Sequence, residues 1–428
     1  MAGLKQIIKP PFLDDTAKEM LIAMQKQANA LNSIAATQYV QSTNMATWQD
    51  LALLMEQGIE IARKVMPVGT VILHDWTDVG DNNKVYTDVE SVILDYKMLT
   101  TPTGKIKPAA MVGWRHTLPF NIQFDNYEAF YAAENELPAG TYNVVLDYTW
   151  TKAIAGTYQF TLTKPVPAGG QLTGFKNAAD VGCTATTVIS YASAESTEKI
   201  EEVAITEGTD GTCLGHFTAA GTAELNSFQR AAYGYNRWSQ SALRQYLNSD
   251  GAVNTWWKPQ NKYDRPPDIV TSKAGFLSGC SEEFKACIQP VNITTALNTV
   301  TDSADGTSEV TEDKIFLLSL QEINITPQLA DVEGDTTEYW AESLGVNGYA
   351  KPYPPNYYDA YKVGAINAKT TAQYAFTRSA NRGNAFSVWY LNPSGCVSNS
   401  YARYALRALP ACYITSNPTN LPLAPERQ

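Results

Sequence analysis

Histidine and cysteine, the residues that most often hold transition metals or act as nucleophiles, are scarce in this chain. Its 428 residues include three histidines and six cysteines. No two cysteines form a CxxC pair, so the spacing typical of zinc and thioredoxin-like sites is missing. The sequence also lacks a P-loop, a GxGxxG fingerprint and a GxSxG nucleophile elbow. We therefore expect no catalytic residues, no metal and no cofactor, and we expect the cysteines to be buried reduced thiols.

Charge is also sparse, and cations are outnumbered. Charged residues make up 18% of the chain, and 32 Lys+Arg against 43 Asp+Glu give a formal net charge of −11. Such a chain lacks the clustered cations that attract nucleic acid or an anionic membrane surface. No apolar run is long enough to cross a bilayer, and no apolar segment follows Lys5 and Lys9 as in a signal peptide. We expect no nucleic-acid partner and no membrane insertion.

Apolar residues are plentiful, at 44%, which predicts a folded chain with a substantial core. Residues 1–67 are predicted to be a helical, oligomerising segment. Six apolar residues recur there at alternating steps of four and three, as in a heptad seam: Ala17, Leu21, Met24, Ala28, Leu31 and Ala35. This seam fits either a helix packed on its own domain or the stalk of a homo-oligomer. A second helix is predicted to begin at a capping-box-like Thr47–Asp50 and to end near Met66-Pro67.

Residues 68–168 change to short β-rich runs between turn residues, which predicts a small β-domain. Two of these runs begin alike, at Ala139-Gly140-Thr141-Tyr142 and Ala155-Gly156-Thr157-Tyr158, and should be consecutive antiparallel strands. Residues 169–415 are predicted to form a second domain with a helix at 239–247, and residues 416–428 an extended tail. The acidic stretch 301–313 lacks the EF-hand pattern and is expected to be a solvated loop.

The most informative segment spans residues 378–412, where fixed-looking positions alternate with polar and aromatic ones. The fixed-looking frame is Arg378, Ser379, Trp389, Gly395, Val397, Ala402, Ala405, Arg407, Ala408 and Pro410. Between these lie Phe386, Ser387, Tyr390, Cys396, Ser398, Asn399, Ser400, Tyr401, Arg403, Tyr404 and Leu406. Antibody paratopes use such residues, because aromatics give rigid contact area and small polar residues give adaptable hydrogen bonds. The composition fits a binding face, and equally a strand pair with a tyrosine ladder. Trp389, Val397, Leu409, Leu243 and Leu247 are predicted core residues.

This segment resembles the variable region of target proteins of diversity-generating retroelements. In that family, adenines of an RNA template are mutagenised, so Asn codons such as AAC become almost any codon ending in C. Each of the eleven intervening residues can be reached from such a codon, and none is Lys, Glu, Gln, Met or Trp. Upstream, residues 236–248 are similar to a domain of unknown function from gut bacteria and their prophages. That domain is related to the formylglycine-generating-enzyme type of C-type lectin fold.

The resemblance implies an α+β fold, in which a C-terminal C-type lectin-like domain follows N-terminal helices and a small antiparallel β-domain. It also implies that the eleven intervening residues form an exposed ligand-binding face. The Glu-Pro-Asn and Gln-Pro-Asp motifs of calcium-dependent sugar binding are absent. The catalytic cysteine pair of the formylglycine-generating enzymes has no convincing match, since the context of Cys280 and Cys287 differs. Neither activity is therefore carried over.

The resemblance implies that this chain is a phage tail-fibre or tail-tip protein. We expect it to be made in the bacterial cytoplasm without a signal peptide and assembled into the virion, as a homotrimer in contact with other tail proteins. Its variable face should recognise a receptor on the host cell surface, either protein or glycan. One alternative is an oxidase on the formylglycine-generating-enzyme fold. Another is a purely structural virion protein, in which the eleven variable positions would be buried.

Overall fold

The structure is a computed structural model. It describes residues 46–80, 83–129, 131–146, 156–162, 165–173, 186–191, 200–204, 216–217, 223–343 and 363–415, with isolated positions of an N-terminal helix. Strands account for 36% of the structure and helices for 21%, and the strands form several small antiparallel sheets. The expected α+β class with N-terminal helices is therefore wrong, because the protein is mostly β.

The helices are short because the sequence interrupts them. α2 (Trp48–Gln57) begins with the predicted capping box, in which Thr47 and Asp50 bond each other's backbone N–H. It stops at Gly58, whose φ of 100° an α-helix does not allow, and α3 (Ile59–Val65) ends just before Met66-Pro67. The predicted helix at 239–247 is divided by Ser241. A 3₁₀ turn (Trp238–Gln240) precedes this residue, and α5 (Ala242–Leu247) follows it.

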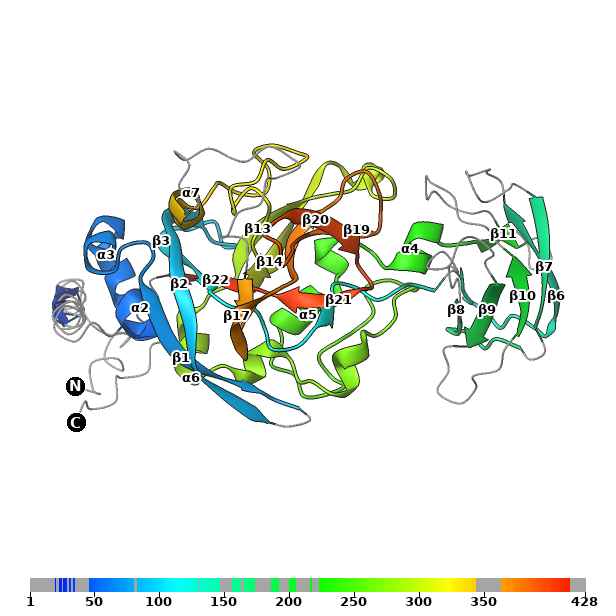
Figure 1. Cartoon of the computed structure of the whole chain (residues 1–428), viewed down its shortest axis with the longest axis horizontal. Helices are drawn as coiled ribbons and strands as arrows, with labels where there is room; N and C mark the ends of the chain where they lie inside the picture. The colour runs from blue at the N-terminus through cyan, green and yellow to red at the C-terminus, as the bar shows by residue number, and fades with distance from the viewer. Residues whose placement is uncertain are drawn as a thin grey trace.

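A five-stranded antiparallel sheet lies next to α2 (Figure 1). Its order is β1 (Val71–Asp78), β2 (Lys84–Thr100), β3 (Ile106–Trp114), β22 (Pro410–Thr415) and β15 (Ile315–Leu317). Helix α2 contacts β3 and β22, and α7 (Glu338–Ser343) contacts β2. The sheet therefore joins three strands of the predicted 68–168 domain to two strands of the predicted 169–415 domain, and one hydrophobic core extends across both ranges.

A second five-stranded sheet carries the segment singled out in the sequence. Its order is β20 (Val397–Tyr401), β19 (Ser387–Leu391), β18 (Ala375–Ala380), β21 (Ala405–Ala408) and β4 (Ile122–Gln123). Among the described strands, β20 pairs only with β19, so it is an edge strand. The predicted core residues are buried: Trp389, Val397, Leu409, Leu243 and Leu247.

The stretch expected to be an acidic loop is ordered instead. Residues Ser308–Asp313 form β14, which pairs with β13 (Val291–Ala296). Asp313 is fully buried and accepts hydrogen bonds from Trp238 Nε1 at 2.9 Å and Arg244 Nε at 2.6 Å. The expectation of a solvated loop is therefore wrong. Trp238 and Arg244 are distant in sequence, but they bind the Asp313 carboxylate and allow it to be buried.

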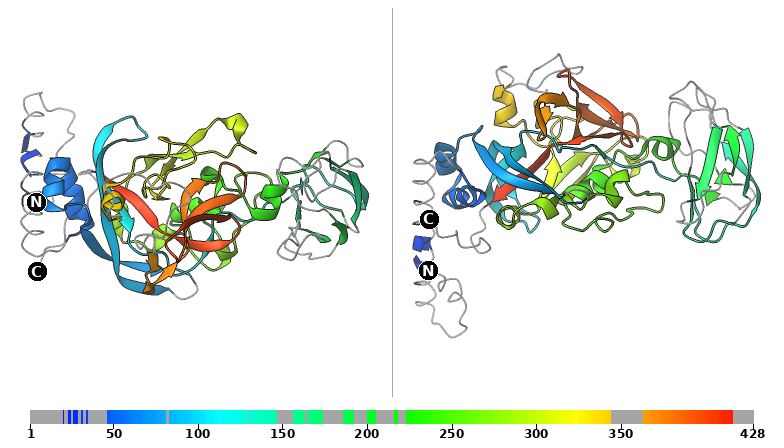
Figure 2. Two further views of the ribbon diagram at one scale, coloured as in Figure 1. Left: turned by 45° about the horizontal axis from the view of Figure 1, so that its top comes forward. Right: turned by 60° about the horizontal axis from the view of Figure 1, so that its bottom comes forward.

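A separate group of strands lies at one end of the molecule, beyond α4 (Phe228–Tyr233) (Figures 1 and 2). β6 (Gly140–Leu146) and β7 (Gly156–Leu162) are antiparallel neighbours, as their similar starts predicted. They share a sheet with β11 (His216–Phe217) and β12 (Ala223–Glu224). The other sheet contains β5 (Tyr131–Ala132), β8 (Gln171–Thr173), β9 (Thr186–Tyr191) and β10 (Ile200–Ala204). We call this group the distal module, and the chain returns from it to the body through α4.

Three of the six residues of the predicted heptad seam, Ala17, Leu21 and Ala35, lie outside the described residues. Met24, Ala28 and Leu31 are described and helical; Ala28 is half-buried, and Met24 and Leu31 have 45% and 65% of their surfaces exposed. The tail 416–428 also lies outside the described residues.

Candidate binding face and the carboxylate cluster behind it

The predicted frame and the predicted variable positions differ in burial. Most frame residues are buried, for example Trp389, Val397 and Ala402, whereas Ala405 is exposed and Arg407 is half-buried. Ten of the eleven variable positions are half-buried or exposed: Phe386, Tyr390, Cys396, Ser398, Asn399, Ser400, Tyr401, Arg403, Tyr404 and Leu406. Ser387 is the exception, with 2% of its surface exposed.

The eleven positions do not form one continuous patch, because neighbouring side chains in a strand point to opposite faces. In the β19–β20 register, Ser387 lies opposite Tyr401, and Tyr390 lies opposite Ser398. Tyr401 and Asn399 therefore share one face of β20, and Ser398 and Ser400 share the other. The ring of Tyr390 lies 5.6 Å from that of Tyr374. Cys396 follows the turn between the two strands, and Leu406 pairs with Ile122 of β4.

Four of the variable residues gather around one residue that the sequence did not single out. Tyr233, at the end of α4, has its ring centroid 4.2 Å from Tyr401 and 4.8 Å from Phe386. Tyr404 lies 5.0 Å from Tyr401, and the Arg403 guanidinium lies 5.1 Å above the Tyr404 ring. We call these five residues the aromatic cluster. Tyr233 is buried, Tyr404 is 37% exposed, and the others are half-buried.

Backbone hydrogen bonds fix the aromatic cluster to the body. The Arg403 N–H donates to the Tyr233 carbonyl at 2.9 Å, and the Asp125 N–H donates to the Ala402 carbonyl at 3.1 Å. Gly234, with φ of 84°, allows this close approach, since a Cβ there would lie 2.7 Å from the Asp125 carbonyl oxygen. The contact joins residues far apart in sequence, so the local pattern around Tyr233 carried no signal of it.

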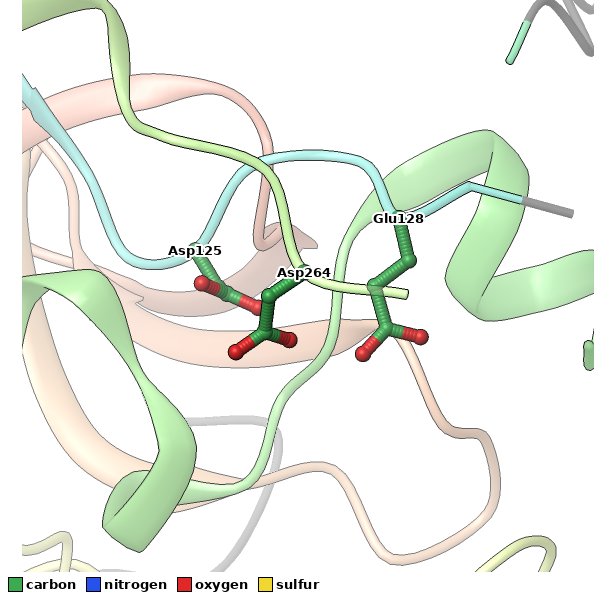
Figure 3. Close-up of side chains that lie close together, drawn as sticks. All are labelled: Asp125, Glu128 and Asp264. Carbon is green, nitrogen blue, oxygen red and sulfur yellow. The ribbon is translucent and has the colours of Figure 1, made fainter. Parts of the chain in front are cut away.

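A cluster of three buried carboxylates lies behind the aromatic cluster. Oxygens of Asp125, Glu128 and Asp264 lie within 4.8 Å of one another, and the three side chains point toward a common space (Figure 3). Glu128 accepts hydrogen bonds from Arg230 Nε and a second Arg230 nitrogen, both at 2.7 Å. Asn261 Nδ2 donates to Glu128 at 2.9 Å and to Asp264 at 2.6 Å. Arg230 is on α4, so the same helix contributes to both clusters.

The charges of this carboxylate cluster are not balanced, because Arg230 faces three acids. Burial, with the charges of Asp264 and Glu128, raises the pKa of Asp125 well above its ordinary value. Burial and the charge of Glu128 raise the pKa of Asp264 to about 7. Burial also acts to raise the pKa of Glu128, but Arg230 holds it below its usual range. Such a set of oxygens can hold a proton or a hard divalent cation such as Ca²⁺.

Cys280, Cys287 and His74 offer no reactive site. Cys280 and Cys287 are free thiols, and burial raises the pKa of both, that of Cys287 to about 12, so neither is a thiolate at neutral pH. His74 lies between Trp48 and Trp114, with ring centroids at 5.2 and 5.7 Å. Burial lowers the pKa of His74 to about 4, so its imidazole is neutral. No helix in the described parts of the chain is long and apolar enough to cross a membrane.

Comparison with known proteins gives one match. Residues 204–416 match the model of a family described as a domain of unknown function, DUF6273. No curated protein and no solved structure matches the chain. The matched range contains α4, Asp264 and the whole of residues 378–412, whereas Asp125 and Glu128 precede it.

Proposed function

We propose that this protein binds a receptor on the host cell surface through the aromatic cluster and the residues around it, and that it is a target of a diversity-generating retroelement. The observation that carries the proposal is the position of the cluster. Tyr401, Arg403 and Tyr404 belong to the segment that resembles a diversified region, and they lie at the edge of a sheet whose frame is buried.

The difference in burial between the frame and the predicted variable positions supports the proposal that this segment is diversified. A buried residue such as Trp389 contributes packing energy, and replacing it destabilises the fold by several kcal/mol, about 3–5 for Trp to Ala. Exposed residues away from special features usually tolerate exchange within about 0.5 kcal/mol. A face built from half-buried and exposed positions can therefore change its ligand without loss of the fold.

The chemistry of the aromatic cluster suits recognition. Tyrosine and arginine are enriched among residues that dominate binding energy, because they combine large contact area with a polar group. Tyr401 packs on the buried Tyr233, and Tyr404 packs on Tyr401, which reduces the conformational entropy that the two rings lose on binding. Both a protein receptor and a glycan present surfaces that such rings can cover.

We place the protein in a phage tail fibre or tail tip, as a homotrimer beside other tail proteins. The exposed helical residues Met24 and Leu31 support the oligomer, since both occupy the predicted heptad seam. Several copies of a face on one fibre raise the avidity without new contacts. The N-terminal helices and the distal module lie at opposite ends of the molecule, which leaves one end for attachment (Figure 1).

Two alternative functions have less support. A purely structural virion protein would bury the variable positions, but ten of the eleven are half-buried or exposed. An oxidase of the formylglycine-generating type needs reactive cysteines, but burial raises the pKa of the Cys280 and Cys287 thiols.

The test is adsorption of the purified protein, or of phage carrying it, to host cells. Tyr401→Ala combined with Tyr404→Ala should lower adsorption more than tenfold while circular dichroism stays unchanged. The matched control is Met98→Ala with Ile106→Ala, two exposed apolar residues on β2 and β3. Equal adsorption of the two double variants would place the receptor contact outside the aromatic cluster.

A further inference from the structure

A cavity of about 330 Å³ lies away from the aromatic cluster, against the sheet that contains β2, β3 and β22. α7 and β16 (Val363–Ala365) border it. Its apolar lining includes Val92, Leu94, Trp114, Leu318, Trp340 and Leu409. The lining also includes polar and charged residues, and pockets that bind small molecules have this size and combine apolar walls with a few polar groups.

Cations gather at this cavity in a chain whose formal net charge is −11. Arg115 and Lys369 both line it, and their side chains are 52% and 38% exposed. Both bind the carboxylate of Glu90. Arg115 Nη1 lies 2.9 Å from Glu90 Oε2, and Lys369 Nζ lies 2.7 Å from Glu90 Oε1. Two cations and one carboxylate leave a local charge of +1, which a second carboxylate would neutralise.

We propose that this cavity binds a small aromatic carboxylate. The ring would lie among Trp114, Trp340 and Leu318, and the carboxylate would pair with Arg115 and Lys369. This site shares no residue with the aromatic cluster, so it does not depend on the proposed receptor function.

Isothermal titration of the full-length protein with indole-3-acetate tests the proposal, and indole-3-acetamide serves as the uncharged analogue. We expect the acid to bind and the amide to bind about tenfold more weakly, the equivalent of one lost charge interaction. Lys369→Met should weaken binding of the acid by a similar factor. The control Lys105→Met, at an exposed lysine preceding β3, should not.

Three outcomes would overturn the proposal: no heat of binding at millimolar indole-3-acetate, equal affinities for the acid and the amide, or the same loss of affinity in Lys369→Met and Lys105→Met. Equal affinities would assign the cavity to neutral aromatic molecules. Because Lys369 is on the surface, Lys369→Met should fold normally, and its melting temperature compared with wild type verifies this.

Discussion

Tyr233 and Tyr401 pack ring against ring with their centroids 4.2 Å apart, although one ends α4 and the other ends the edge strand β20. The same helix binds Glu128 through Arg230. α4 therefore connects the aromatic cluster, the carboxylate cluster and the distal module. Under the proposed function, β20 could exchange its outer side chains while its packing on α4 keeps the strand in place.

Substitutions in the frame should destabilise the protein much more than substitutions at the predicted variable positions. Trp389→Ala should lower the free energy of unfolding by about 3–5 kcal/mol, because Trp389 is buried in the core. Tyr404→Ala should change it by no more than about 0.5 kcal/mol, because Tyr404 is 37% exposed. Urea unfolding measures both. If Tyr404→Ala destabilises the protein as much as Trp389→Ala, Tyr404 is part of the core. The proposed receptor-binding role of the aromatic cluster would then fail.

The buried ion pair of Arg378 and Glu322 should be the anchor of the variable segment. Arg378 also donates to the carbonyls of Leu317 at 2.8 Å and Glu333 at 2.7 Å. The ammonium group of lysine cannot make the same set of hydrogen bonds as the planar guanidinium of Arg378. Arg378→Lys should therefore destabilise the fold by about 3–5 kcal/mol. Arg382→Lys, at a half-buried arginine on the following turn, is the control and should have little effect. A loss below about 1 kcal/mol for Arg378→Lys would contradict this role.

Stability should fall as the pH rises from about 4 to about 7. The pKa of Asp264 is about 7 in the folded protein, against about 3.9 for an unfolded aspartate. Between these values the folded state holds a proton that the unfolded state has lost. Stability therefore decreases from about pH 4 to pH 7, by up to about 1.4 kcal/mol per pH unit.

Thermal unfolding from pH 4 to pH 8 measures this slope. Asp264→Asn should flatten it, whereas Asp268→Asn, at an exposed residue nearby, should not. Ca²⁺ at pH 8 should raise the melting temperature of the wild type but not of Asp264→Asn, since a cation can replace the proton among the three carboxylates. An unchanged slope in Asp264→Asn would show that another group titrates.

Assembly should depend on the N-terminal helix. Met24→Glu with Leu31→Glu places charges on the predicted seam and should convert a trimer to monomers in sedimentation velocity. Lys26→Glu changes charge on the same helix outside the seam and should leave the oligomer intact. A wild-type monomer would remove the stalk proposal.

Local patterns in the sequence predicted local structure correctly. The Thr47–Asp50 capping box starts α2, and the two similar strand entries lead to the antiparallel pair β6 and β7. Trp389 and Val397, which belong to the fixed-looking frame, and Leu243, on the predicted helix, are core residues as expected. In each of these cases the relevant interaction is between near neighbours, or depends only on hydrophobicity.

The pairing of distant strands and the composition of the two clusters depend on tertiary contacts that no local pattern indicates. The pairing of β22 with β3 places residues 410–415 in the same sheet as β1 and β2, and the short helices leave a protein that is mostly β. Tyr233 joins the aromatic cluster, and Asp264 joins Asp125 and Glu128, only because long-range backbone pairing brings these segments together. A strand's periodicity determines which side chains share a face, but the choice of partner strand depends on how the whole chain packs.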